Sequence, residues 1–467
     1  MRTLFSLIAA VCAGTLSVSP LQPRPVSLVV ANGIVVTENQ SRRVIQRGAV
    51  AIDGRDIVAV DEAEAIAARF TASERVDADG GVIMPGLINT HTHAPMVLFR
   101  GLADDLALME WLQKYIFPAE AKTVSPEFVR AGTRLAALEM IESGTTTYVD
   151  MYYFEEEIAR ATREAGLRGV LGETIIQFPV PDAKTPAEGI ARAERFIEGF
   201  ADDDLITPAI APHAMYTNDA ATLKACRAVA DRLHAPVIIH LAETKDEANG
   251  SQQKHHKTPV AYLDSLGFWG PRTIAAHGVW LTSDDMRVLA RRHFGVSHNP
   301  ESNMKLASGW ARVPEMRRAG IPVGLGTDGA ASNNDLDMFE AMRQAAFLHK
   351  LMTNDPRAIP APVAIDMATI DGARAIGMDR EIGSLEPGKR ADVIVVSMRA
   401  ARQTPLYDAL SHLVYVTRGD DVRATIVNGK VLMRDRRVLT LDREAVLTEA
   451  RAMAARVREA VRPGGGK

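Results

Sequence analysis

Short apolar runs alternate with longer amphipathic segments through the middle of the chain. Apolar strands separated by helical patterns indicate βα units and a parallel sheet. Eight runs qualify as strands: GLINTHTH (86–93), TTTYVDMY (145–152), RGVLGET (168–174), ITPAIAPHA (206–214), PVIIHLAE (236–243), TIAAHGVW (273–280), FGVSHNPES (294–302) and IPVGLGTDG (321–329). Eight such units over about 300 residues predict a (β/α)8 TIM barrel of the α/β class.

The segment SPEFVRAGTRLAALEMIESG (125–144) illustrates the helices expected between these strands. Ser125 is a favourable N-cap, Pro126 suits the first helical position, and Gly144 is a stop signal. The apolar positions of the segment recur at helical spacing, at Phe128, Ala131, Leu135 and Leu138.

Both ends of the chain show a different, β-rich pattern. VSLVVANGIVVTENQ (26–40) and GAVAIDGRDIVAVD (48–61) predict hairpin-like units around Asn32-Gly33 and Asp53-Gly54. RADVIVVSM (390–398) and VRATIVNGKVLMRDRRVL (422–439) show the same pattern, with Asn428-Gly429 in the turn. We therefore expect residues 26–81 and 386–440 to form one small composite β-sandwich domain. The barrel would occupy residues 82–385, and residues 441–467 would form a C-terminal helix and tail.

The first 25 residues, MRTLFSLIAAVCAGTLSVSPLQPRP, form a signal-like leader. Arg2 precedes an apolar stretch from Leu4 to about Val18, and prolines follow, as in a secretory signal. The pattern predicts an exported or periplasmic protein; an uncleaved tail on a cytoplasmic protein is the alternative. The stretch is shorter than the ~20 residues of a spanning helix, and no later segment is continuously apolar for that length, so no integral membrane segment is expected.

The composition limits the kinds of molecule that the chain is expected to bind. A chain of 467 residues with 47% hydrophobic and 24% charged residues can bury a large core and form two domains. A net charge of −4 without a long basic run predicts no nucleic-acid or anionic-membrane partner, and favours a small-molecule substrate. The cysteines are Cys12 and Cys226, so a chain without the leader would hold no intramolecular disulfide. A second copy of the chain, in a homo-oligomer, is the other partner that the composition allows.

Two histidines one residue apart stand at the end of the first barrel strand, in PGLINTHTHAPMVLFRGLADD (85–105). Residues i and i+2 of a strand share a face, so His91 and His93 can reach one ion. An HxH pair alone is weak evidence. His240, His277 and Asp328 end the fifth, sixth and eighth predicted strands, at the barrel rim where enzymes of this fold place their chemistry.

Three histidines and one carboxylate suit one divalent ion, most simply Zn²⁺, with a position left for water. We expect His91, His93, His240 and Asp328 to be its ligands. His277 could be a further ligand, but we favour a role in orienting the attacking hydroxide. The fourth strand, LITPAIAPHAMYT (205–217), contains no lysine that could bridge two ions, so one ion is expected.

Glu243 lies three residues beyond His240, where a carboxylate could pass protons between water and a substrate ring nitrogen. We expect it to be the general acid and base, with His277 and Asp328 completing the catalytic set. The alternative is that Glu243, in the charged stretch ETKDE, is a solvated loop residue.

At these residues the sequence resembles the amidohydrolase superfamily, and in particular the methylthioadenosine/S-adenosylhomocysteine deaminases. The likeness runs from about Leu28 to Val438. It rests on MPGLINTHTHAPMVLFRGLADDLALMEWLQKYIFPAE, APHAMYT, IIHLAET, HNPESNMKLASG, GTDGAASNNDLDMF and IGSLEPGKRADVIVV. The resemblance implies the same four metal ligands, and substrate contacts from Glu120, His213, Glu243 and Asp328, with Glu120 on the ribose hydroxyls.

The resemblance thus implies hydrolytic deamination of adenosine, methylthioadenosine or S-adenosylhomocysteine to the inosine analogue and ammonia. One rival is another amidohydrolase, acting on a guanine-type base or a triazine, as an aminohydrolase or chlorohydrolase. The other is a non-catalytic barrel that only binds. Trp310 and Arg312 depart from the usual pattern of the resembled family, at positions expected to border the pocket.

Overall fold

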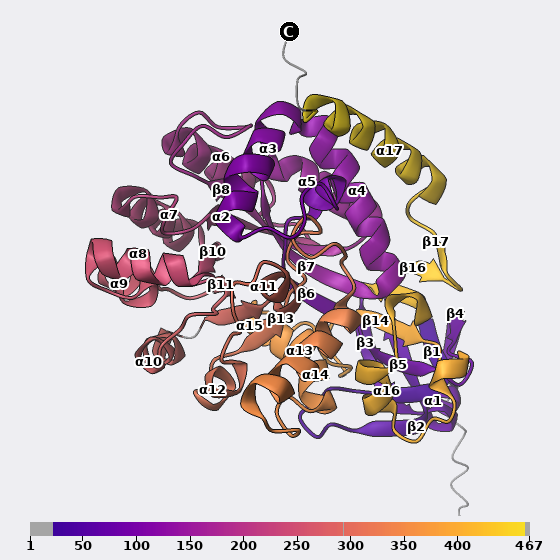
Figure 1. Cartoon of the computed structure of the whole chain (residues 1–467). Coiled ribbons are helices and arrows are strands. Elements are labelled where there is room, and N and C mark those ends of the chain that lie inside the picture. The colour runs from indigo at the N-terminus through magenta and orange to yellow at the C-terminus, as the bar shows by residue number, and fades with distance from the viewer. Residues whose placement is uncertain (1–21, 293, 463–467) are drawn as a thin grey trace, which may run out of the picture.

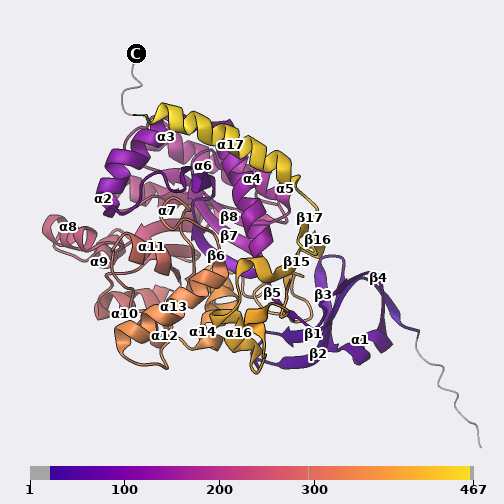
Figure 2. The ribbon, with the colours of Figure 1, turned by 45° about the vertical axis from the view of Figure 1, so that its right-hand side comes forward.

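The computed structural model describes residues 22–292 and 294–462, and its strands form two sheets (Figures 1 and 2). The predicted leader lies outside the described residues, except for residues 22–25. Within the described ranges, no helix has both the length and the apolar character required to cross a bilayer.

The larger structural unit is a barrel of eight parallel strands that neighbour one another in chain order. All eight predicted strands are confirmed: β6 (Leu87–Thr92), β7 (Thr145–Tyr152), β8 (Arg168–Ile175), β9 (Ile206–Pro212), β10 (Val237–Leu241), β11 (Thr273–His277), β12 (Gly295–His298) and β13 (Val323–Leu325). The Asp328 N–H donates to the His91 carbonyl at 2.9 Å, which brings the last strand against the first. The predicted TIM barrel is therefore confirmed.

Helices surround this sheet (Figure 1). They are α4 (Pro126–Ser143), α5 (Glu155–Ala165), α6 (Pro186–Gly199), α7 (Ala220–Leu233), α8 (Lys245–His255), α9 (Pro259–Ser265), α10 (Ser283–Arg292), α11 (Pro300–Lys305), α12 (Val313–Arg318), α13 (Met338–Thr353), α14 (Ala361–Ala368) and α15 (Ile370–Ala375). Helix α4 has the predicted ends: the Ser125 hydroxyl accepts the Phe128 N–H at 3.3 Å, and Gly144 is left-handed with φ 87°.

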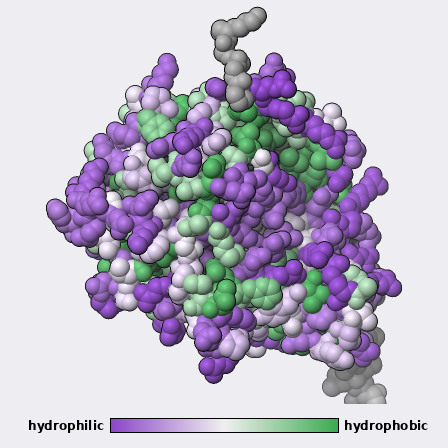
Figure 3. Space-filling view, in the orientation of Figure 1, coloured by the Kyte–Doolittle hydropathy of each residue, from purple (hydrophilic) through white to green (hydrophobic). Residues whose placement is uncertain are grey.

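A continuous helical segment follows β6 and a short turn, η1 (Ala94–Phe99). It consists of α2 (Leu108–Trp111), a π-helical turn, η2 (Leu112–Ile116), and α3 (Phe117–Thr123). The C-terminal helix α17 (Arg443–Ala460) packs along α3 and α4. The face in Figure 3 is largely hydrophilic, with apolar areas beside α4 and α17 and over α11 and α13. In α11 and α13, Met304, Phe347 and Leu351 are exposed.

The second sheet joins the two chain ends, as the sequence predicted. Its strands are β1 (Arg24–Val36), β2 (Val44–Asp53), β3 (Asp56–Glu62), β4 (Phe70–Asp77), β5 (Val82–Pro85), β14 (Val393–Val396), β15 (Val422–Val427), β16 (Lys430–Arg434) and β17 (Arg437–Val438). Helix α1 (Ala63–Arg69) lies against β2 and β3, and α16 (Ala409–Tyr415) packs on α13 and α14. Side chains from β1–β3 and β14–β16 share one core, so the sheet encloses apolar residues between its two halves.

The hairpins at Asp53-Gly54 and Asn428-Gly429 are confirmed. The expected turn at Asn32-Gly33 is wrong, because β1 runs through both residues with register shifts on either side of Gly33. A Cβ on Gly33 would lie 2.6 Å from the Gly81 carbonyl oxygen. Gly33 is therefore explained by a close backbone approach at an irregular strand position, not by a turn.

Candidate metal and catalytic site

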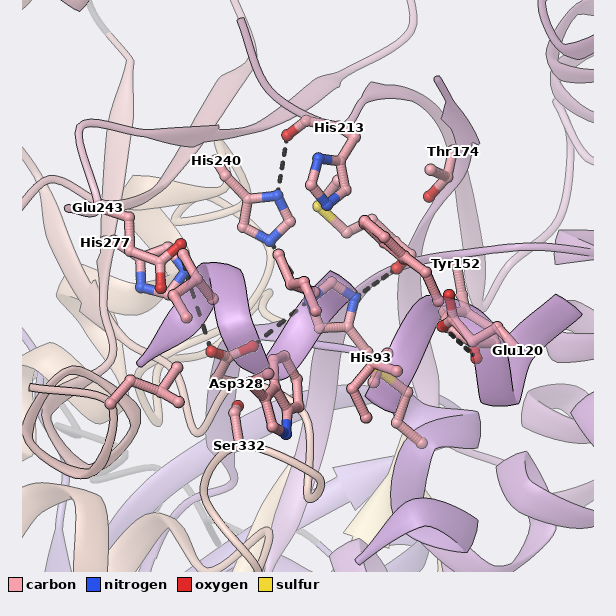
Figure 4. A pocket seen from close by; sticks show the side chains of 18 of the residues that line it. His93, Glu120, Tyr152, Thr174, His213, His240, Glu243, His277, Asp328 and Ser332 are labelled. Carbon is pink, nitrogen blue, oxygen red and sulfur yellow. Dashed lines mark hydrogen bonds and ion pairs between the residues drawn. The ribbon is translucent and has the colours of Figure 1, made fainter. Parts of the chain in front are cut away.

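A cavity lies at the carboxyl ends of the barrel strands (Figure 4). Four of the histidines singled out in the sequence line it: His93, His213, His240 and His277. Asp328, Glu243 and Glu120 line it as well. His91 lies directly behind, with its ring centre 4.9 Å from that of His93. The structure therefore brings every predicted site residue together in or beside one cavity.

Backbone carbonyl groups fix the rings of two histidines. The Met151 carbonyl accepts from Nδ1 of His93 at 2.6 Å, and the His213 carbonyl accepts from Nδ1 of His240 at 2.8 Å. A proton on Nδ1 leaves Nε2 of each neutral ring as an acceptor. These two Nε2 atoms face each other at 3.3 Å. Two acceptors so close without a shared proton are suited to a cation.

His91 lacks a hydrogen-bond partner at both ring nitrogens although its side chain is fully buried. Its Nε2 lies 3.4 Å from Oδ1 of Asp328, the same distance that separates Nε2 of His93 from that oxygen. Burial lowers the pKa of His91 to about 4, which favours the neutral imidazole that binds metals. The donor atoms of His91, His93 and His240 lie within 4.8 Å of one another. This donor set fits a divalent ion of the zinc type.

Asp328 is held in a defined orientation. Ser302 donates its hydroxyl to Oδ2 at 2.6 Å, and the Gly329 N–H donates to Oδ1 at 2.8 Å. Asp328 and His277 have φ of 65° and 74°, in the left-handed region that non-glycine residues rarely adopt. Such strained backbone is typical of functional sites, where the surrounding structure enforces it.

His277 and Glu243 lie together at one side of the cavity (Figure 4). Nδ1 of His277 donates to the side-chain oxygen of Asn303 at 2.9 Å, and its Nε2 lies 3.8 Å from Glu243 Oε2 and 3.9 Å from Asp328 Oδ2. Burial alone would lower the pKa of His277, but these two carboxylates raise it. Glu243 is only 3% exposed, so the alternative of a solvated loop residue is wrong. Burial raises its pKa, as suits a proton donor.

Glu120 lies across the cavity from His277 and Glu243 (Figure 4). It comes from α3, and its Oε1 accepts the hydroxyl of Tyr152 at 2.8 Å. Burial raises the pKa of Glu120 to about 7. His213 lies beside His240 (Figure 4), with their ring centres 4.6 Å apart, and its Nδ1 is 3.1 Å from the Thr217 hydroxyl. The cavity thus carries an acidic group at each end.

Sequence reasoning missed the residues that orient the site. Asn303 and Ser302 belong to the quoted motif HNPESNMKLASG. Their sequence neighbours give no sign that Asn303 contacts His277 or that Ser302 contacts Asp328. Tyr152 is the last residue of β7 and gave no signal of its contact with Glu120. The expectation for Trp310 was wrong, because its ring faces His349 of α13, at a centroid distance of 6.5 Å, and does not line the cavity.

Arg312 does not line the cavity either. Its guanidinium lies 3.6 Å from Glu315 and within hydrogen-bond distance of Ser283. Neither departure from the resembled family therefore lines the cavity.

Comparison with known proteins agrees with this geometry. The sequence profile described as "Amidohydrolase family" matches residues 82–432. A 5-methylthioadenosine/S-adenosylhomocysteine deaminase of Syntrophobacter fumaroxidans is 48% identical over 91% of this chain and 97% of its own length. A 5'-deoxyadenosine deaminase of Methanosarcina acetivorans is 45% identical, with the same two coverages. The crystal structure of a zinc-bound adenosine deaminase from Xanthomonas campestris superposes with a TM-score of 0.92 at 40% identity, covering 93% and 99% of the two chains.

Proposed function

This chain belongs to the amidohydrolase family, and we propose that it is a metal-dependent deaminase that converts an adenine nucleoside to its inosine analogue and ammonia. Adenosine, methylthioadenosine and S-adenosylhomocysteine are the candidate substrates. One observation carries this proposal: a single cavity has the histidine and Asp328 cluster with Glu243 on one side, and the Glu120 carboxylate on the other. That arrangement suits a ligand with a reactive ring at one end and a diol at the other.

We further propose that His91, His93, His240 and Asp328 hold one ion, which we expect to be Zn²⁺. The facing Nε2 atoms of His93 and His240 support this assignment, as do the partnerless ring nitrogens of His91. A related structure was determined with bound zinc. When bound, such an ion supplies Lewis acidity that lowers the pKa of water toward neutrality.

The residues around the ion would move the protons. Asp328 accepts a proton from the attacking water, and Nε2 of His277 orients the water oxygen toward C6 of the purine. Glu243, whose pKa burial raises, would donate a proton to the adjacent ring nitrogen. Asp328 then returns its proton to the amino group, the C6–N bond breaks, and ammonia leaves. Glu243 takes the remaining hydroxyl proton as the carbonyl forms, which restores its starting state.

Glu120 favours a nucleoside over the rival substrates. A carboxylate can accept two hydrogen bonds from vicinal hydroxyls, and bonds to a charged acceptor are strong. A triazine or a free base offers no diol, so it would leave this buried acid unused. The non-catalytic alternative is disfavoured because the chain retains a complete set of donors around a cavity.

Steady-state assay of purified protein tests this function. Ammonia release should be measured with adenosine, methylthioadenosine, S-adenosylhomocysteine and guanine, and release of both ammonia and chloride with a chlorinated triazine. We expect the nucleosides to be deaminated with the highest kcat/KM. A higher kcat/KM for guanine or triazine would favour the rival function, and no turnover of any compound by metal-loaded protein would favour the binding role.

Export is a separate proposal that rests on the leader pattern alone. If residues 1 to about 19 are a signal, mature protein should be recovered outside the cytoplasm with its N-terminus near Pro20 or Gly14. N-terminal sequencing after cell fractionation tests this, and an intact Met1 in the cytosolic fraction would contradict it.

A further inference from the structure

A pair of buried carboxyl groups, those of Asp150 and Glu155, lies at the junction of β7 and α5. Both residues are fully buried, and their side chains are within hydrogen-bonding distance of each other. Neither residue lines the cavity, and the proposed deamination uses neither. Burying a carboxyl group is costly unless its oxygens have partners, so the partners of these oxygens indicate what the pair does.

Glu155 holds the peptide unit that orients the ring of His93. Its Oε1 accepts the Tyr152 N–H at 2.8 Å. That N–H belongs to the same planar peptide unit as the Met151 carbonyl, which accepts from Nδ1 of His93 at 2.6 Å. Because a peptide unit is rigid and its N–H and carbonyl point in opposite directions, Glu155 fixes the direction of the carbonyl that holds the His93 ring.

Asp150 holds the backbone that follows His93. Its Oδ1 accepts the N–H of Ala94, the next residue, at 2.5 Å. The second oxygen of each carboxyl group, Oδ2 of Asp150 and Oε2 of Glu155, has no other partner among the described residues. Two buried acceptors that meet in this way are accommodated when they share one proton, because ionising both would place two negative charges side by side. Burial and the Asp150 carboxylate raise the pKa of Glu155, which favours the shared proton.

The turn before α5 is itself held in place, so Glu155 has a defined position. The Glu155 N–H donates to Oε2 of Glu173 at 3.2 Å, and the Phe154 N–H donates to Oδ2 of Asp182 at 2.7 Å. Nε of Arg192 lies 3.0 Å from Glu173 and 3.2 Å from Asp182. Arg192 thus compensates the charge of the two carboxylates that hold this turn.

We propose that Glu155 is a positioning residue for the metal site, and that it acts by sharing one proton with Asp150. The inference rests on the proposed function and adds to its ligand set two residues that touch neither ion nor substrate. Glu155 sets the Met151 carbonyl against the His93 ring, and a ligand histidine held in this way has a fixed orientation and tautomer, which strengthens its hold on the ion. The role requires the length of the side chain and one shared proton, not a second negative charge.

Two variants separate length from charge. Glu155→Gln keeps the length, its amide oxygen can accept the Tyr152 N–H, and its amide N–H can donate to Asp150. Glu155→Asp keeps the acid but is one methylene shorter, so it loses reach toward one of the two partners. The Zn²⁺ affinity of each metal-free protein is measured by competition with a chromophoric chelator. We expect Glu155→Gln to stay within about threefold of the wild-type affinity, and Glu155→Asp to bind at least about tenfold more weakly.

Glu157→Asp is the matched control. Glu157 also belongs to α5 and is only 6% exposed, but its carboxylate pairs with Arg130 at 2.7 Å and not with Asp150. Its variant should bind Zn²⁺ as the wild type does. A loss in Glu155→Gln or in the control as large as that in Glu155→Asp would overturn the inference, as would wild-type affinity in Glu155→Asp. Wild-type protein that binds no Zn²⁺, or that binds it and deaminates no nucleoside, would instead overturn the proposed function.

The shared proton has a signature of its own, which does not require Glu155→Asp to fold. The infrared difference spectrum between zinc-loaded wild-type protein and Glu155→Gln should contain the C=O stretch of one protonated carboxylic acid, present in the wild type alone. Absence of that band would overturn the inference, because the two carboxyl groups would then share no proton.

Discussion

Replacing Glu120 with alanine should impair nucleoside deamination selectively. Tyr152 donates to Oε1 of Glu120 at 2.8 Å, and an ionised carboxylate offers about four lone-pair sites. Two ribose hydroxyls can therefore be accommodated without displacing the tyrosine. Loss of that pair of charge-assisted bonds should cost about 2 to 4 kcal/mol of transition-state binding, or about 30- to 1,000-fold in kcat/KM.

The assay is kcat/KM for adenosine and for adenine, with wild-type and Glu120→Ala protein at saturating metal. Activity on adenine should change little, because the base has no ribose. Tyr152→Phe is the control for disturbance of the Tyr152–Glu120 hydrogen bond, because it keeps the Glu120 carboxylate and removes only the tyrosine hydroxyl that donates to it. Metal content is measured for every variant. Equal losses on both substrates would refute the reasoning and show that Glu120 supports the site generally.

Three further predictions follow from the site. His91→Ala and His240→Ala should each lose both the ion and activity, and a full equivalent of metal with normal turnover in either would contradict the ligand assignment. Glu243→Gln should keep its metal but lose about 10²- to 10⁴-fold in kcat, and near-normal turnover would exclude it as the proton donor. Because burial raises the pKa of Glu120 to about 7, kcat/KM for adenosine should fall as pH drops through that value and the carboxylate gains a proton. The same fall with adenine would assign the titration to another group.

The barrel could be predicted because each of its strands has a recognisable pattern within its own short stretch of sequence. Each strand is a short apolar run, and each run stands between helical patterns, so periodicity alone located all eight strands. The rim of the cavity followed from the same argument. Parallel strands place their carboxyl ends at one edge, so His91, His240, His277 and Asp328 were expected together before any contact was known.

The orienting contacts could not be predicted, because they join segments far apart in the chain. Tyr152 of β7 meets Glu120 of α3, and Asn303 of α11 meets His277 of β11. The Asn-Gly pair at residues 32–33 wrongly predicted a turn. Gly33 lies inside β1, where the backbone of Gly81 approaches it too closely for a side chain. The π turn at Leu112–Ile116 gave no recognisable pattern in the sequence. These features depend on tertiary context, which propensity and spacing do not report.

Metal removal and restoration with one nucleoside substrate tests the central claim most directly. Purified protein is stripped with a chelator, assayed with methylthioadenosine, and assayed again after stoichiometric addition of Zn²⁺. We predict no turnover by the stripped protein. Turnover should return with one equivalent of metal per chain, and one ammonia should be released for each inosine analogue formed. Full activity in the stripped protein, or restored metal without formation of the inosine analogue, would contradict the account.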